Sequence, residues 1–456
     1  MAKDVPHILL INPWIHDFAA YDFWAKPMGL LSIAGILRAQ GLKVSYLDCL
    51  NRFHPRSARP DSGIKFGRGP YLKTRLSKPA GLEDVDRNFS RYGVKPSWFR
   101  DDLLNLARPD LVLITSLMTY WYPGVQETIS QVRSVFPRTP IVLGGIYARL
   151  CPEHAARNSG ADRIAVEPAE KCLNRLIFEF TGFSAATDFD PANMDSYPYP
   201  ALDLQRKIDY VPLLTTRGCP YNCAYCASGF LEPLQLRRSP DSVLAEIRYW
   251  YAKYGQRDFV LYDDAFLVDS EKHAVPLLEA ICRADLQVRF HTPNALHIRG
   301  INDATARLMY RAGFTTLRLG LETTDFDHRS QIDHKVSQQD FRQAAACLLK
   351  AGFDKTRVGA YLLVGLPGQD FSEIEYSIRT VLDSGLTPVP AYYTPIPHTA
   401  LWPRAVAASR YDLASDPVYT NNAVLPCRKE PFSWDLITHT KSLCNGKVHA
   451  SGVNRS

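Results

Sequence analysis

Short, nearly continuous runs of apolar residues recur along the first 170 residues. Runs without alternation are typical of strands that are covered on both faces. Helices are predicted between them, and Met28–Gln40 lies between Pro27 and Gly41, a start and a stop signal. The alternation predicts a parallel, doubly wound (flavodoxin-like) sheet. Its predicted strands are His7–Asn12, Val44–Asp48, Leu111–Thr115, Ile141–Gly144 and Arg163–Ala165.

A second series of strands and helices begins near Val211. Its helices carry clear boundary signals, such as Ser239-Pro240 at one start and Gly352 at one end. Six βα units in series predict an α/β fold with a partial (β/α)6 barrel, in which chemistry gathers at the C-terminal ends of the strands. The predicted strands are Val211–Thr216, Phe259–Tyr262, Val288–Thr292, Thr316–Leu321, Val358–Val364 and Pro388–Tyr393.

Four segments follow from this pattern. We expect a doubly wound domain over 1–180, a linker over 181–207, a barrel over 208–405 and a C-terminal tail over 406–456. The first domain contains an insertion at about 51–95 without clear periodicity, and loops of that length are usually functional or disordered. The insertion is basic, because the stretch from Asn51 to Arg100 holds twelve Lys/Arg and four Asp/Glu.

Composition narrows the class of protein. Hydrophobic residues make up 46% and charged residues 22% of 456 residues, which excludes a mainly disordered chain and a disulfide miniprotein. No run of eighteen apolar residues predicts a membrane span, and the N-terminus does not resemble a signal peptide. The net charge of +6 comes from the basic stretch, so we expect no nucleic-acid partner. Seven of ten cysteines are scattered, which favours a reducing, cytoplasmic location.

The other three cysteines form one cluster directly after the first barrel strand. Cys219, Cys223 and Cys226 stand in RGCPYNCAYCASG, with the spacing CxxxCxxC. Three nearby thiolates suit a soft metal, and a four-iron cluster held by three cysteines keeps one iron open for another ligand. A structural zinc site needs a fourth ligand, and no second pair is present. The alternatives are a zinc knuckle or buried free cysteines.

This loop resembles the signature of the radical S-adenosylmethionine (SAM) enzymes, including an aromatic residue, Tyr225, before the third cysteine. The resemblance extends to about Ala405. It implies a [4Fe-4S] cluster on Cys219, Cys223 and Cys226 whose open iron binds the amino and carboxylate groups of SAM. One-electron reduction of SAM then gives a 5′-deoxyadenosyl radical. The resemblance also implies an electron donor such as flavodoxin or ferredoxin.

Later strand ends extend the resemblance to SAM-binding segments. Asp264 ends LYDD, Asn294 ends TPN, Glu322 ends LGLE and Gly365 lies in LVGLPG. In the family such positions contact the amino end, the ribose, the methionine part or the adenine of SAM. Each of these residues has a plain alternative, because a residue after a strand often serves only the turn or the core.

The first domain resembles the cobalamin-binding domain that precedes some radical SAM barrels. Ser116-Leu117 and Gly144-Gly145 match that family's Ser-x-Leu and Gly-Gly positions, where small residues admit the nucleotide tail of cobalamin. The alternative is an unliganded flavodoxin-like domain. The DxHxxG motif of histidine-on-cobalt proteins is absent, so His16 is predicted to be a loop or substrate-facing residue.

Two further features have plain interpretations. The basic insertion, with Lys65, Arg68, Lys73, Arg75 and Lys78, could cover an anionic substrate or the cobalamin edge, but a solvated surface excursion is favoured. Cys427 and Cys444 are predicted to be free thiols and not ligands of a second cluster.

Three functions compete. The first is a cobalamin-dependent methyltransferase that acts on an unactivated carbon of a small molecule. The second is a radical SAM enzyme that catalyses a rearrangement, cyclisation or oxidation. The third is a non-catalytic iron–sulfur protein. The sequence identifies neither the catalytic residues, nor the substrate, nor the oligomeric state.

Overall fold

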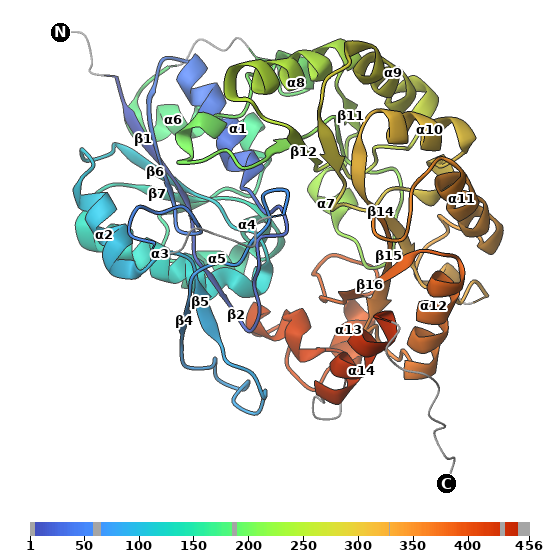
Figure 1. Ribbon diagram of the computed structural model, residues 1–456. Helices are drawn as coiled ribbons and strands as arrows, with labels where there is room; N and C mark the ends of the chain where they lie inside the picture. Colours follow the sequence, from blue (N-terminus) through green and yellow to red (C-terminus); the bar gives the residue numbers. More distant parts are fainter. Residues whose placement is uncertain (1–4, 58–64, 185–188, 328, 429–433, 446–456) are drawn as a thin grey trace.

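The N-terminal domain is a five-stranded parallel sheet in the strand order β3-β1-β6-β7-β8 (Figure 1). The computed structural model describes residues 5–57, 65–184, 189–327, 329–428 and 434–445. The predicted strands are confirmed with small changes at their ends. Strand order reverses between β1 and β6, as in doubly wound folds that bind ligands there. The strands are β1 (His7–Asn12), β3 (Lys43–Asp48), β6 (Leu111–Ile114), β7 (Ile141–Leu143) and β8 (Arg163–Ile164).

Helices cover both faces of this sheet, because β1 is apolar on both sides. Leu9 and Ile11 pack toward α2 and α3, whereas Ile8 and Leu10 pack toward α1 and α6. The helices are α1 (Met28–Ala39), α2 (Pro96–Leu104), α3 (Tyr122–Val135), α4 (Ile146–Leu150), α5 (Pro152–Asn158) and α6 (Ala169–Thr181).

The second half is a six-stranded parallel sheet in the order β16-β15-β14-β13-β12-β9, with helices on its outer face (Figure 1). It is an open, partial barrel, as predicted. The strands are β9 (Val211–Leu213), β12 (Asp258–Leu261), β13 (Arg289–His291), β14 (Phe314–Glu322), β15 (Val358–Val364) and β16 (Thr387–Tyr392). The helices are α8 (Pro240–Tyr254), α9 (Ala274–Ala284), α10 (Asp303–Arg311), α11 (Gln338–Lys350) and α12 (Phe371–Asp383).

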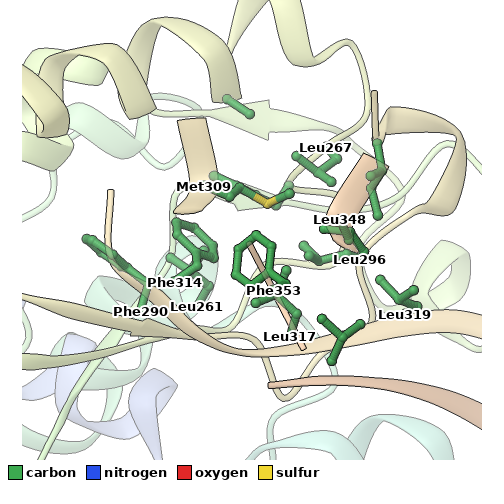
Figure 2. Close-up of a cluster of buried hydrophobic side chains, with 14 of the residues drawn as sticks. Leu261, Leu267, Phe290, Leu296, Met309, Phe314, Leu317, Leu319, Leu348 and Phe353 are labelled. Carbon is green, nitrogen blue, oxygen red and sulfur yellow. The ribbon is translucent and has the colours of Figure 1, made fainter. Parts of the chain in front are cut away.

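Alternation along the barrel strands separates an outer from an inner face. Leu317 and Leu319 of β14 pack outward into the main core, together with Met309 and Leu348 from the helices (Figure 2). The residues between them on the strand therefore face the lumen. Phe314 also packs into the main core, because the pairing of β13 with β14 shifts register between Phe314 and Thr316. The predicted strand Val211–Thr216 is shorter in the structure, because the backbone amides of Thr215 and Thr216 bind a side chain of the next strand end instead.

The basic insertion is more structured than the favoured prediction. It forms a small antiparallel sheet, β2-β5-β4, from β2 (Ile15–Asp17), β5 (Ser90–Tyr92) and β4 (Lys73–Arg75). Lys73 and Arg75 are exposed, as a solvated excursion requires. Phe66, however, packs with Trp24 and Tyr210 against Val260 on the lumen side of β12. The reading of the whole insertion as a surface excursion is therefore wrong.

The tail contributes two helices and a connection between the domains. α13 (Trp402–Ala408) and α14 (Trp434–Cys444) lie beside the last barrel strands. Val418 and Val424 pack with Leu82 and Phe89 of the insertion, and Asn421 donates a hydrogen bond to Asp17 at 2.9 Å. Within the described ranges, no helix is long and apolar enough to cross a membrane. The predictions for 1–4, 58–64, 185–188, 429–433 and 446–456 lie outside the described residues.

Candidate active site

The three-cysteine loop lies at the C-terminal end of β9 and is held on both sides by backbone hydrogen bonds. Ala224 N donates to Ile332 O at 2.8 Å, and Leu401 N donates to Ala224 O at 2.8 Å. Gly218 opens the loop with φ +79°, and a Cβ there would overlap the backbone oxygen of Leu234. The loop position is thus fixed by chain segments before and after it, and only glycine fits its first turn.

The thiols of the loop differ in environment. Cys226 is exposed and its Sγ accepts a hydrogen bond from Ser228 N at 3.4 Å, whereas Cys219 Sγ lies 3.7 Å from His297 Nε2. Burial raises the pKa of Cys219 and raises that of Cys223 to about 11. These two thiols stay protonated at neutral pH until a metal displaces the proton.

The three thiols of the loop are the candidate metal ligands. Over the residues that the structure describes, no three His, Cys, Asp or Glu side chains converge on one point that could hold one ion. A four-iron cluster spreads its thiolates over separate corners, so three separate thiols on one short loop are the donor set it needs.

Tyr225 and Glu322 meet on a residue that the sequence analysis missed. Lys335 Nζ donates to Tyr225 Oη at 2.8 Å and to Glu322 Oε1 at 2.9 Å. Glu322 ends β14 with φ +65°, a strained conformation for a residue with a side chain. Neighbouring acidic groups, chiefly Glu322, outweigh burial and raise the pKa of Lys335. The result is a buried cation beside Cys223 at the rim of the barrel.

The end of β12 braces the start of the cysteine loop. Asp263 Oδ1 accepts hydrogen bonds from the backbone amides and hydroxyls of Thr215 and Thr216. Asp263 Oδ2 is buried without a partner, and burial raises the pKa of this carboxyl to about 6. The predicted residue Asp264 is its neighbour, and burial raises its pKa too.

Asn294 is exposed and donates to Tyr262 O at 2.8 Å, so its amide holds the loop after β12.

Gly365 follows β15 directly and forms a turn with φ +90°. Its N–H donates to Gln369 Oε1 at 2.8 Å, and a Cβ would lie 2.9 Å from Leu425 Cδ2. The structure thus brings Tyr225 and Glu322 together, whereas Asp264, Asn294 and Gly365 occupy separate loops of the same rim.

Ser116, Gly144 and Gly145 come together at the C-terminal edge of the first sheet. Ser116 Oγ donates to Gly144 O at 2.6 Å. Gly145 has φ +92°, and a Cβ there would overlap the backbone oxygen of Ser116. A Cβ on Gly144 would meet only Ala165 Cβ at 3.8 Å, which leaves open space at this position. Leu117 is 41% exposed beside them.

Two contacts bring this glycine edge next to the cysteine loop. Arg149 of α4 lies 3.1 Å from Glu232, which follows the short helix α7 (Ser228–Leu231) after Cys226. His398 Nε2 lies 3.1 Å from Leu150 O. The two candidate cofactor edges therefore face a common interface.

A cavity of about 1270 Å³ opens along the same edge of the first domain. It exceeds the roughly 300–1,000 Å³ typical of pockets for small ligands, so a large ligand fits it. Its lining combines aromatic side chains with a few charged ones and includes Asp17, Phe18, Tyr71, Arg87, Met118 and Trp121.

The remaining predicted residues have other roles. His16 lies in β2 and pairs with Glu127 at 2.8 Å, so the expectation of a loop residue is wrong. Alternation along β2 instead directs Ile15 and Asp17 to the cavity. Cys427 is buried among apolar side chains, and burial raises its pKa to about 12, while that of Cys444 rises to about 11.

Comparison with known proteins identifies both halves. The family model described as the radical SAM superfamily matches residues 213–381, and the B12 binding domain matches residues 94–177. The chain is 27% identical over 329 residues to an uncharacterized methyltransferase, PH0819, of Pyrococcus horikoshii, covering 66% of this chain and 70% of that one. It is 22% identical over 379 residues to the cytidylyl-2-hydroxyethylphosphonate methyltransferase of Streptomyces wedmorensis, covering 69% and 65%.

Solved structures share the two-domain fold. The radical SAM methyltransferase TsrM from Kitasatospora setae, solved with cobalamin and a [4Fe-4S] cluster, gives a TM-score of 0.64 at 16% identity, covering 89% of this chain and 79% of that one. The cobalamin-dependent radical enzyme OxsB, solved with aqua-cobalamin and SAM, gives 0.58 at 12% identity, covering 92% and 58%.

The fold and the site therefore define a radical SAM barrel preceded by a cobalamin-binding domain. The chain thus combines a radical SAM domain over residues 213–381 with a B12 binding domain over residues 94–177. Its cofactors are a [4Fe-4S] cluster, SAM and cobalamin.

Proposed function

We propose that the protein transfers a methyl group to an unactivated carbon of a small molecule. The observation that carries the proposal is the contact between the two edges. Arg149 and Leu150, which follow the Gly144-Gly145 turn, touch Glu232 and His398 on the barrel side. A methyl donor at one edge and a radical source at the other would then meet the same substrate. Such proximity is the main contribution that a protein makes to this chemistry.

Three sets of residues would bind the three cofactors. Cys219, Cys223 and Cys226 would hold the cluster. Asp264, Asn294, Glu322 and Gly365 would border SAM, with Tyr225 and Lys335 fixing the position of Glu322. Ser116, Leu117, Gly144 and Gly145 would border the nucleotide tail of cobalamin. When bound, these groups supply a hydrogen-abstracting radical and a transferable methyl group.

The chain contributes position and shielding. Lys335 holds the Glu322 side chain at the barrel rim through their buried ion pair at 2.9 Å. Asp263 fixes the strand end from which the cysteine loop starts. The insertion and the tail close the lumen and the cavity from the side, which limits the access of water to a radical.

An electron donor such as a flavodoxin or ferredoxin belongs to the proposal, since the cluster needs one electron in each cycle. So does a cytoplasmic location, because free thiols and an iron–sulfur cluster need a reducing compartment.

The test uses protein purified without oxygen, loaded with cluster and cobalamin, and supplied with SAM and a reductant. We expect both 5′-deoxyadenosine and S-adenosylhomocysteine with a substrate present. Cys223→Ala should lose the absorption of the cluster and both products, while it keeps the corrin bands. Deoxyadenosine without S-adenosylhomocysteine for every substrate tested would overturn methyl transfer and favour a rearrangement, cyclisation or oxidation.

A further inference from the structure

Arg318 is a cation on the inner face of the barrel. It lies between Leu317 and Leu319 of β14, both of which pack outward, so its side chain points into the lumen. It is half-buried although it stands in a central strand, which means that solvent reaches the lumen at this level. Its Nη1 donates to the neighbouring Leu317 O at 2.8 Å. Gly359 faces it in register on β15, and a Cβ there would lie 3.2 Å from Nη1.

Arg68 of the basic insertion reaches the same space from the other domain. Its guanidinium lies 4.6 Å from the ring centroid of Trp24, and Trp24 stacks on His291 of β13 at 4.8 Å. Its Nε donates to Lys65 O at 3.2 Å. Arg68 is therefore held against the lumen by aromatic packing and a backbone bond, and not by a carboxylate.

The nearby acidic groups are already paired. Asp258 binds Arg289 at 2.7 Å and His291 at 3.1 Å. Glu322 binds Lys335. In the described part of the chain, no carboxylate forms an ion pair with Arg318 or Arg68. Burial lowers the pKa of both guanidinium groups. The Tyr361 hydroxyl beside Arg318 opposes this effect, and the positive charge of Arg68 lowers the pKa of Arg318 further.

Two partly buried cations without a carboxylate partner cost the fold some stability unless a ligand supplies the negative charge. We propose that Arg318 and Arg68 bind an anionic group of the substrate, a carboxylate or a phosphoryl group, across the domain interface. This inference rests on the proposed function for the identity of the ligand as substrate. Guanidinium groups suit such anions, since each offers two parallel donors.

The carboxylate of SAM is another anion that Arg318 and Arg68 could bind. Its position in this class of enzymes argues against that. In this class that carboxylate binds the open iron at the cysteine loop. Arg318 lies four residues before Glu322 on β14, which is about 13 Å deeper along the strand. The anion that binds Arg318 is therefore distinct from the carboxylate of SAM and lies deeper in the barrel.

The first experiment measures binding of inorganic phosphate to the full chain by thermal shift at constant ionic strength. We expect saturable stabilisation of the wild-type protein, and an affinity about tenfold weaker in Arg318→Gln and in Arg68→Gln. Arg342→Gln removes an exposed guanidinium from α11 and should bind as the wild type does. Equal binding in all four proteins would mean an adventitious ion only and would overturn the inference, as would no saturable binding to the wild type.

The second experiment distinguishes a substrate anion from the carboxylate of SAM. It also tests the anion site independently of the proposed function. Anaerobic SAM cleavage without substrate should stay within about twofold of wild type in Arg318→Lys and Arg68→Gln. A tenfold loss would assign Arg318 to SAM and overturn the inference. Arg318→Lys keeps the charge, so it also replaces Arg318→Gln if that variant does not fold. If no substrate is ever methylated but phosphate binding depends on both arginines, the proposed function fails and the anion site stands.

Discussion

At the barrel rim, single buried side chains fix the positions of several candidate site residues. Lys335 binds both Tyr225 and Glu322, and both partners of its ion pair with Glu322 are less than a tenth exposed. A buried pair is weak evidence for net stability, but removing one partner strands the other charge. We therefore expect that replacing Lys335 destabilises the protein, although Lys335 belongs to no local sequence motif.

Lys335→Met should lower the free energy of unfolding by about 3–5 kcal/mol, because it leaves Glu322 buried and uncompensated. The double variant Lys335→Met/Glu322→Leu removes both charges and should recover most of that loss. Urea denaturation of the two proteins and the wild type measures the difference. If the double variant is as unstable as the single one, the cost comes from lost packing and not from a stranded charge.

Asp263 predicts a pH dependence. Its folded pKa of about 6 lies above the ordinary value of 3.8, so the folded state binds the proton more tightly than the unfolded state does. Stability from this group is therefore greatest below pH 3.8 and is lost as the pH rises toward 6, by about 3 kcal/mol in total.

Asp263→Asn should remove this dependence, since Oδ1 keeps its four hydrogen bonds and the unpartnered Oδ2 becomes an amide. Urea unfolding across this range should show Asp263→Asn gaining on the wild type as the pH rises. His273, which lies 2.8 Å from Thr215 Oγ1, titrates in both proteins and cancels in the comparison. A difference between the two proteins that is constant with pH would contradict the assignment.

Local residues of this site could be predicted, and its long-range partners could not. The spacing of Cys219, Cys223 and Cys226 is visible within eight residues of sequence. Lys335 meets Tyr225 from 110 positions away, and no period or motif marks it. Asp263 and Asp264 are adjacent and chemically identical, so only the structure shows that Asp263 makes the clamp to Thr215 and Thr216.

Among the elements, the turn after β7 is the sharpest test of cobalamin binding, because its two glycines differ. Gly145 has no room for a Cβ, whereas Gly144 has open space beside it. Sequence could predict the small residues and the strand before them. It could not show that the fold requires a glycine at 145, whereas the glycine at 144 leaves open space.

Gly144→Ala should therefore fold with a stability within about 1 kcal/mol of wild type but bind cobalamin more weakly, if the nucleotide tail passes this point. Gly145→Ala should lose about 2 kcal/mol or more of stability from its positive φ and its overlap with Ser116. Urea denaturation and the corrin absorption of reconstituted protein check the two effects. Unchanged cobalamin affinity in Gly144→Ala would remove this turn from the site.

Sequence also could not show how the insertion is used. Its charge pattern favoured a solvated surface, and Lys73 and Arg75 fit that description. Phe66, an apolar residue in an irregular part of the insertion, instead enters the lumen of the barrel beside Trp24. Irregular segments carry no periodicity that reports burial, so their docking surfaces are invisible to pattern analysis.

For the whole molecule, the two domains are joined by buried charges beside a cavity of about 360 Å³. Asp209, just before β9, binds Lys26 at 2.5 Å and Arg52 at 2.7 Å, and all three side chains are less than a tenth exposed. A second ion pair joins the same parts of the chain at the surface. Arg38 binds Asp203 at 2.8 Å, with side chains 45% and 35% exposed.

These two pairs give a matched test of domain coupling. Asp209→Asn leaves the buried Lys26 without this carboxylate, while Arg52 keeps Asp22 at 3.1 Å. The variant should therefore cost about 3 kcal/mol and separate the thermal unfolding of the two domains into two calorimetric transitions. Asp203→Asn removes an exposed partner and should cost no more than about 1 kcal/mol, with a single transition kept. If both variants unfold alike, the domains are held together by the apolar contacts of Trp24, Phe66 and the tail. In that case, loss of the charge at Asp209 would leave the shared interface, and therefore methyl transfer across it, intact.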